Sequence, residues 1–137
     1  MTTLNEAWEL SRDDRGLAVV STLRADGTIQ SSVVNTAVLG AGLAFVTYGP
    51  VKIANLRRRP QVTTTFRNGW RWATVEGTAV ITGPDDPGVD AERLRLLLRE
   101  IFQAAGGTHD DWDEYDRVMR EQRRVAVLVT PTRVYSN

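Results

Sequence analysis

Apolar and polar residues alternate along six stretches of the chain, which is the pattern of β-strands that bury one face. Short turns rich in glycine or asparagine, such as 24–27, 40–42 and 68–69, separate several of these stretches and favour antiparallel hairpins. The predicted strands cover residues 16–23, 28–39, 43–48, 61–67, 70–82 and 125–129, with a further strand-like segment at 133–135.

Helical periodicity appears in four other segments. Thr3 and Glu6 have the spacing of a capping box and predict a short helix that ends near Asp13. A brief helix is expected between the third strand and Pro60, because proline disfavours the helical conformation of the residue before it. Asp90 caps a third helix with leucines at helical spacing, and residues 108–111 open a fourth.

The order of these elements favours an α+β fold over a doubly wound parallel sheet, because the strands lack helical crossovers. We expect a six-stranded antiparallel barrel with flanking helices, formed by one domain that spans residues 1–137. Gly40-Ala41-Gly42 is not a dinucleotide-binding motif, because it joins two strands and has no third glycine at the required spacing.

The composition narrows the classes of function. Seventeen basic residues balance seventeen acidic ones, which argues against a general nucleic-acid or anionic-membrane partner. The chain has no cysteine, so disulfides, thiolate nucleophiles and sulfur-ligated metals are excluded. Glu6 and Glu9 interrupt the region where a signal peptide needs an apolar run, and no stretch is long enough for a membrane span. We therefore expect a soluble, cytoplasmic protein.

Catalytic side chains are scarce. His109 is the only histidine, and its place among aspartates at a helix start is typical of an exposed capping loop rather than of a general base or metal ligand. The acidic pairs at 13–14, 85–86 and 110–111 fall at turns or helix ends, where aspartate is ordinary. Redox chemistry then requires a bound cofactor that carries the reaction.

Lys52, the only lysine beside sixteen arginines, lies in the brief helix before Pro60. Gly49 and Pro50 suit the start of this helix, and we expect the amides of the next three residues, Val51, Lys52 and Ile53, to lack partners within it. Such amides and the positive end of the helix dipole favour a phosphate. At about 100° per residue, Lys52, Asn55 and Arg59 share one face. The alternative is that these residues have no ligand, since a lysine in the first turn and arginines in the last turn are common on any solvated helix.

Three blocks of the sequence, residues 23–33, 52–62 and 69–79, resemble the flavin/deazaflavin split-barrel superfamily that contains pyridoxamine-phosphate-oxidase-like proteins. The resemblance extends to residues 111–115 and 123–125, and is greatest to the actinobacterial branch that binds coenzyme F420. It implies a homodimer of six-stranded split β-barrels, with two cofactors held in grooves at the interface.

The resemblance also implies roles for residues. Lys52 and Asn55 match the lysine and asparagine that hold the cofactor's phosphate or ribityl region. The ring is expected to contact polar residues of the second and third strands, namely Gln30, Ser31, Ser32, Asn35, Thr47 and Tyr48. Trp70 and Trp72 of the partner's fifth strand are expected to line the substrate side, although aromatic residues on such a strand also serve packing alone.

One departure from the superfamily pattern concerns Pro50, which stands where relatives often have a second basic residue. Anion contacts are then expected from Arg57, Arg58 or backbone amides, and this arginine cluster suits the polyglutamate tail of F420. The leading hypothesis is an F420-dependent oxidoreductase that transfers hydride between the deazaflavin and a small conjugated organic substrate. The alternatives are an FMN-dependent oxidase or oxidoreductase of the same fold and a non-catalytic F420- or flavin-binding protein.

Overall fold

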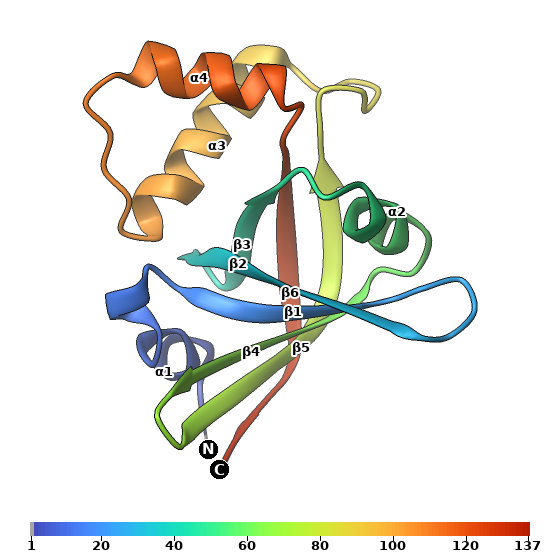
Figure 1. Ribbon diagram of the computed structural model, residues 1–137, viewed down its shortest axis with the longest axis vertical. Coiled ribbons are helices and arrows are strands. Elements are labelled where there is room, and N and C mark those ends of the chain that lie inside the picture. The colour runs from blue at the N-terminus through green and yellow to red at the C-terminus, as the bar shows by residue number, and fades with distance from the viewer. Residues whose placement is uncertain (1) are drawn as a thin grey trace.

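The computed structural model describes residues 2–137 and shows a closed antiparallel barrel with strand order β1-β2-β3-β6-β5-β4 (Figure 1). The strands are β1 Leu17–Leu23, β2 Ile29–Leu39, β3 Gly42–Thr47, β4 Gln61–Asn68, β5 Arg71–Thr82 and β6 Val125–Ser136. The helices are α1 Leu4–Glu9, a 3-10 turn at Arg12–Asp14, α2 Pro50–Arg58, α3 Ala91–Ala104 and α4 Trp112–Glu121. The predicted six-stranded α+β barrel is confirmed.

The barrel is filled by the inward members of each alternating strand. Val20, Phe45, Phe66, Val75 and Val127 are fully buried in this core. Burying each such side chain contributes about 1.5–3 kcal/mol to folding, which is why the strands close around one shared interior. Helix α2 packs against β1 and β5 and adds Leu56 to the same core.

A second core lies outside the barrel, under α3. The outward residues of β2, β3 and β6 at this surface are the small residues Ala37, Ala44 and Ala126. Leucines of α3 pack on these alanines, because small residues let the helix approach the sheet closely. Figure 1 shows the α3–α4 pair at one end of the molecule, opposite the two chain termini.

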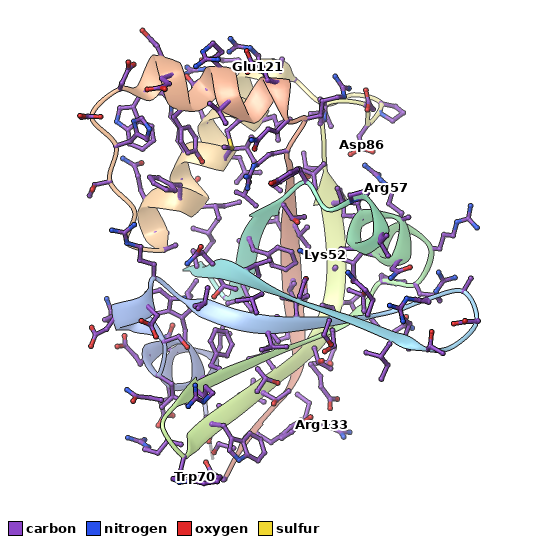
Figure 2. The ribbon with its side chains drawn as sticks, in the orientation of Figure 1. Lys52, Arg57, Trp70, Asp86, Glu121 and Arg133 are labelled. Atoms are coloured by element: carbon purple, nitrogen blue, oxygen red, sulfur yellow. The ribbon has the colours of Figure 1, made fainter. Side chains whose placement is uncertain are left out.

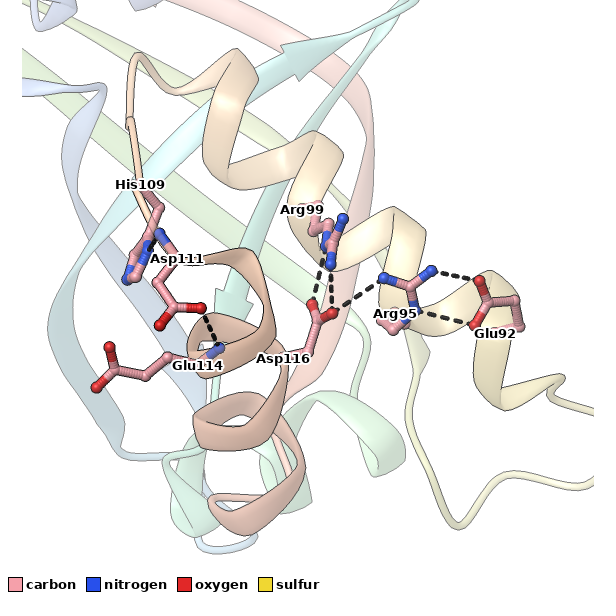
Figure 3. Close-up of polar contacts among 7 residues, drawn as sticks. All are labelled: Glu92, Arg95, Arg99, His109, Asp111, Glu114 and Asp116. Carbon is pink, nitrogen blue, oxygen red and sulfur yellow. Dashed lines mark hydrogen bonds and ion pairs between the residues drawn. The ribbon is translucent and has the colours of Figure 1, made fainter.

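Helix α4 is joined to α3 by a partly buried ionic cluster (Figure 3). The carboxylate of Asp116, 7% exposed, accepts a hydrogen bond of 2.9 Å from Nη1 of Arg95 and another of 2.9 Å from Nε of Arg99. The Tyr115 hydroxyl donates to the Leu98 carbonyl at 3.0 Å. Asp111 caps α4 by accepting from the Glu114 amide, so the cap is Asp111 and not Thr108 as the predicted capping box implied. These contacts hold α4 in place beside the barrel.

Several element boundaries differ from the sequence predictions. The first helix ends at Glu9, before the predicted end near Asp13, and a separate 3-10 turn follows at Arg12–Asp14. The last strand runs without a break through Pro131, because the ladder between β5 and β6 shifts register at Glu76/Gly77 and accommodates the proline there. The short turn at Gly40–Ala41 joins β2 to β3, in agreement with our rejection of a dinucleotide motif.

No helix among residues 2–137 is both long and apolar enough to cross a lipid bilayer.

Candidate anion and cofactor site

Gly49 is the N-cap of helix α2, and Pro50 occupies its first position, as the sequence predicts. Its buried face carries Lys52, Asn55 and Leu56, while Arg57 and Arg58 are exposed. Lys52 and Asn55 lie together on the buried face, as predicted. Arg59 follows the last residue of α2 in an extended conformation, and its Nε donates to the Leu23 carbonyl at 3.0 Å.

Lys52 as a whole residue is 6% exposed, and its amine has one neutral hydrogen-bond partner. Its Nζ donates to Oγ1 of Thr47 on β3 at 3.0 Å and lies 5.9 Å from the centre of the Phe45 ring. None of the ion pairs within the described residues includes Lys52. Burial lowers the pKa of this amine below its ordinary value of 10.5, and the nearby positive charge of Arg124 lowers that pKa further.

A cavity of about 450 Å³ opens beside this amine. One wall consists of Val33, Val34 and Asn35 from β2, and another of residues 46–50 at the end of β3 and the start of α2. Lys52 and Arg124 complete the lining. The cavity therefore combines apolar strand surface with two cationic side chains.

The sequence alone did not identify Arg124 as a site residue, although Arg124 belongs to residues 123–125, which resemble the split-barrel superfamily. It immediately precedes β6, and its guanidinium carbon lies 4.1 Å from the centre of the Tyr48 ring, a cation–π contact. Its Nε donates to Oε1 of Gln122 at 2.8 Å. Burial lowers the pKa of Arg124, so this cation is partly desolvated. Only the folded barrel brings it to Lys52, because no local pattern links the two segments.

Asn55 lies on the same helix face as Lys52 but contacts a different strand. Its Nδ2 donates to Oγ1 of Thr22 at 3.0 Å, and that hydroxyl donates to Oε1 of Gln30 at 3.2 Å. Asn55 does not line the cavity of Lys52. Its observed role is to tie α2 to β1 and thereby to position Lys52.

The candidate residues of β2 divide between its two faces, because side chains alternate along a strand. Asn35 faces outward into the cavity, where its Nδ2 donates to the carbonyls of Asp14 and Arg15 at 3.4 and 3.3 Å. Ser31 is exposed and shares a 2.9 Å hydrogen bond with Ser21. Gln30 and Ser32 belong to the other alternating set, and the Ser32 hydroxyl is buried without a partner among the described residues.

One expected anion contact is wrong. The Ile53 amide donates to the Gly49 carbonyl at 3.0 Å, so it is a regular helical hydrogen bond. The amides that remain at the first turn are those of Val51 and Lys52. Arg57, another expected anion contact, forms a two-pronged contact with Asp86, at 2.7 and 3.2 Å, and is not part of the lining of the Lys52 cavity (Figure 2).

The tryptophans lie far from Lys52 within one chain. Trp70 belongs to the turn before β5, not to the strand as predicted, and is 92% exposed at the tip of the β4–β5 hairpin (Figure 2). Trp72 packs edge-on against Tyr135, with ring centres 6.2 Å apart. A single chain therefore does not bring these residues to the cavity.

His109 differs from the expected exposed capping residue. It is partly buried, its Nδ1 accepts from the Asp111 amide at 3.0 Å, and its ring packs near Trp112 and Tyr115. No cluster of three or more histidine, cysteine or acidic side chains suited to a metal occurs in the described part of the chain.

The donors at the cavity fit a phosphate-bearing cofactor. Lys52 and Arg124 supply positive charge without a carboxylate, and the first-turn amides of α2 supply further N–H groups. The valines of β2 and β3 supply an apolar surface against which a flat ring can pack.

Solved structures with this fold include three informative neighbours. A conserved hypothetical protein from Mycobacterium tuberculosis has a TM-score of 0.73 and 22% identity, over 99% of this chain and 84% of that one. An F420 reductase has a TM-score of 0.64 and 21% identity, over 87% of this chain and 88% of that one. A pyridoxamine 5'-phosphate oxidase-related, FMN-binding protein from Nostoc punctiforme has a TM-score of 0.63 and 12% identity, over 97% and 81%.

The sequence profile of the family described as pyridoxamine 5'-phosphate oxidase matches residues 4–137, which is nearly the whole chain. The closed six-stranded barrel and the structural neighbours agree with this family match. The chain therefore belongs to the pyridoxamine 5'-phosphate oxidase family, in the superfamily of split β-barrels.

Proposed function

We propose that the protein is an F420-dependent oxidoreductase in which Lys52 holds the anionic part of the cofactor. One observation carries the proposal: the amine of the only lysine is buried at a cavity wall with a hydroxyl as its hydrogen-bond partner and without a carboxylate. A buried cation without an opposite charge is costly, so such a position favours an anionic ligand.

The residues of the chain bind and orient in this proposal. Lys52 and the first-turn amides of α2 hold the phosphate, and Val33 and Val46 provide apolar surface for the ring. When bound, the deazaflavin supplies the hydride chemistry. Of the candidate proton donors Ser32, Asn35 and Tyr48, only Asn35 and Tyr48 line the cavity. Solvent or the Tyr48 hydroxyl then delivers the proton to a small conjugated substrate, because the Asn35 amide does not titrate.

Support for F420 comes from the sequence resemblance and from the F420 reductase among the structural neighbours. FMN is the second candidate cofactor, because another neighbour is described as FMN-binding and the cavity donors recognise phosphate in either molecule. The third hypothesis is a non-catalytic cofactor carrier. An enzyme would accelerate oxidation of the reduced cofactor by a substrate, and a carrier would not.

The test is a titration of the purified protein with F420 and with FMN, followed by fluorescence quenching. We expect micromolar or tighter binding of one cofactor, and a loss of roughly 10- to 100-fold in Lys52→Ala, because a charge-assisted hydrogen bond contributes about 1.5–3 kcal/mol. Arg117→Ala removes an equal charge from the exposed face of α4 and should bind like the wild type. Failure to bind either cofactor contradicts the proposal.

Turnover is tested separately. Reduced F420 mixed with enones or quinones should be oxidised faster with the protein than without it. Tight binding without any acceleration would favour the non-catalytic carrier.

A further inference from the structure

We propose that Arg124 is the second cation of the anion site and makes the site selective for cofactors that carry a phosphate over the same rings without one. The proposal rests on the proposed function and names the part of the cofactor that is recognised.

The charges around this end of the barrel identify Arg124. Each neighbouring arginine with an acidic partner is neutralised locally: Arg57 by Asp86, Arg123 by Asp85, and Arg95 and Arg99 by Asp116. Within residues 2–137, no carboxylate forms an ion pair with Arg124. Arg124 and Lys52 are thus two desolvated cations that line one cavity and repel each other. An anion bound between Lys52 and Arg124 would offset both the desolvation of the two cations and their mutual repulsion.

The conformation of Arg124 prepares it for an anion. Arg123 has a positive φ of 52°, which ends the turn after α4 and directs the chain into β6. The Arg124 guanidinium then stacks on Tyr48 and is held through Nε by Gln122. Nη1 and Nη2 have no acceptor among the described residues. Because the planar fork is already ordered, it loses little side-chain entropy when its two terminal nitrogens meet phosphate oxygens.

Among the described residues, α2 supplies no cation other than Lys52 to the lining of this cavity. Arg57 is engaged by Asp86, and Arg59 donates to the Leu23 carbonyl. Pro50 occupies the first helical position of α2 in the same cavity lining and carries no charge. The second positive group therefore comes from the residue just before β6, far from α2 in sequence, rather than from the helix that carries Lys52.

The experiment compares ligands with and without phosphate. Calorimetry with FMN and riboflavin, and with F420 and its dephosphorylated deazaflavin ring, is run on wild type, Arg124→Gln and Arg124→Lys. We expect Arg124→Gln to weaken the phosphate-bearing ligand by roughly 10- to 100-fold and the phosphate-free ring by less than threefold, with partial recovery in Arg124→Lys. Arg123→Gln, which removes the adjacent arginine paired with the exposed Asp85, should bind both ligands like the wild type.

Equal losses for the two ligands would assign Arg124 a purely structural role and overturn the inference, as would unchanged binding in Arg124→Gln. Circular dichroism shows whether Arg124→Gln is folded. If glutamine disrupts the turn, the same comparison of ligands with and without phosphate is made on Arg124→Lys.

A wild-type protein that binds none of these cofactors would refute the proposed function, and pyrophosphate would then test Arg124 alone. The inference predicts that pyrophosphate binds wild type and that its affinity falls in both Lys52→Ala and Arg124→Gln. Pyrophosphate binding that is absent from wild type, or as tight in Arg124→Gln as in wild type, overturns it.

Discussion

The amine of Lys52 lies against the Thr47 hydroxyl and the Phe45 ring, with Arg124 as a nearby positive charge. In the ligand-free protein these surroundings disfavour its charged form. The same surroundings increase the gain when an anion arrives, since little water must then be displaced from the amine. Replacing Lys52 by an apolar residue should consequently weaken cofactor binding and raise the stability of the ligand-free protein.

Lys52→Met tests this opposition. We expect the free energy of unfolding of the ligand-free protein to rise by about 0.5–2 kcal/mol at pH 7, because an uncompensated buried charge is replaced by an apolar side chain of similar length. Chemical denaturation measures the change. A less stable Lys52→Met protein would show that the charge is compensated in the folded chain.

The pH dependence follows from the lowered pKa of Lys52. Below that lowered value both states are protonated, and the cost of the buried charge is fully present. Between the lowered pKa and 10.5 the unfolded chain holds more protons, so this group makes stability rise with pH. The rise attributable to Lys52 should disappear in Lys52→Met.

At the scale of single elements, α4 depends on one carboxylate. Hydrogen bonds from Arg99, and then from Arg95, hold the pKa of Asp116 below 3.8. Because the folded pKa is the lower one, this stabilisation is complete above 3.8 and is lost as the pH falls through the folded value. Figure 3 shows both guanidinium groups directed at this side chain.

Asp116→Asn should therefore destabilise the protein by about 1–3 kcal/mol, because two partly buried arginines lose a charged acceptor. Hydrogen exchange should accelerate in α4 before it changes in the barrel strands. Glu121→Gln, which alters only an exposed pair with Arg117, should change stability by less than about 0.5 kcal/mol. Equal effects of the two variants would contradict the assigned role of Asp116.

The elements were predictable because strand alternation and helix caps are local signals. Simple counting also gives two details that the predictions lacked. With Gly49 as the cap, Ile53 is the first residue whose amide bonds back to the cap carbonyl. Likewise, the period of two along β2 separates Gln30 and Ser32 from Asn35. Arg124 was not accessible in this way, because its approach to Lys52 depends on the pairing of β3 with β6.

At the scale of the whole molecule, the paired strands β1 and β2 expose an apolar outer face. Val19 and Val33 lie opposite each other and are 43% and 58% exposed, and Leu17 and Ile29 extend the same surface. Exposed apolar patches of this kind favour protein partners. Val33 also lines the Lys52 cavity, so a second copy of the chain on this face would border the proposed cofactor site. The proposed homodimer is consistent with this arrangement.

Val19→Glu tests the dimer without touching the cavity. We expect sedimentation equilibrium to show a dimer for wild type and a weakening of at least about tenfold for the variant, because the interface would have to bury a charge. Val80→Glu places the same charge on an exposed valine of β5 as a control. A wild-type monomer at micromolar concentration would count against an interface-built site.

Because Lys52 is the only lysine, the role of its amine in holding the cofactor can be measured directly. Labelling with ¹⁵N-lysine gives one side-chain amine signal, whose titration yields the pKa of Lys52 with and without the phosphate-bearing cofactor. We expect a pKa below 10.5 in the free protein and a clear rise when F420 or FMN is bound. A pKa near 10.5 that does not respond to saturating cofactor would contradict the claim that this amine holds the cofactor's anion.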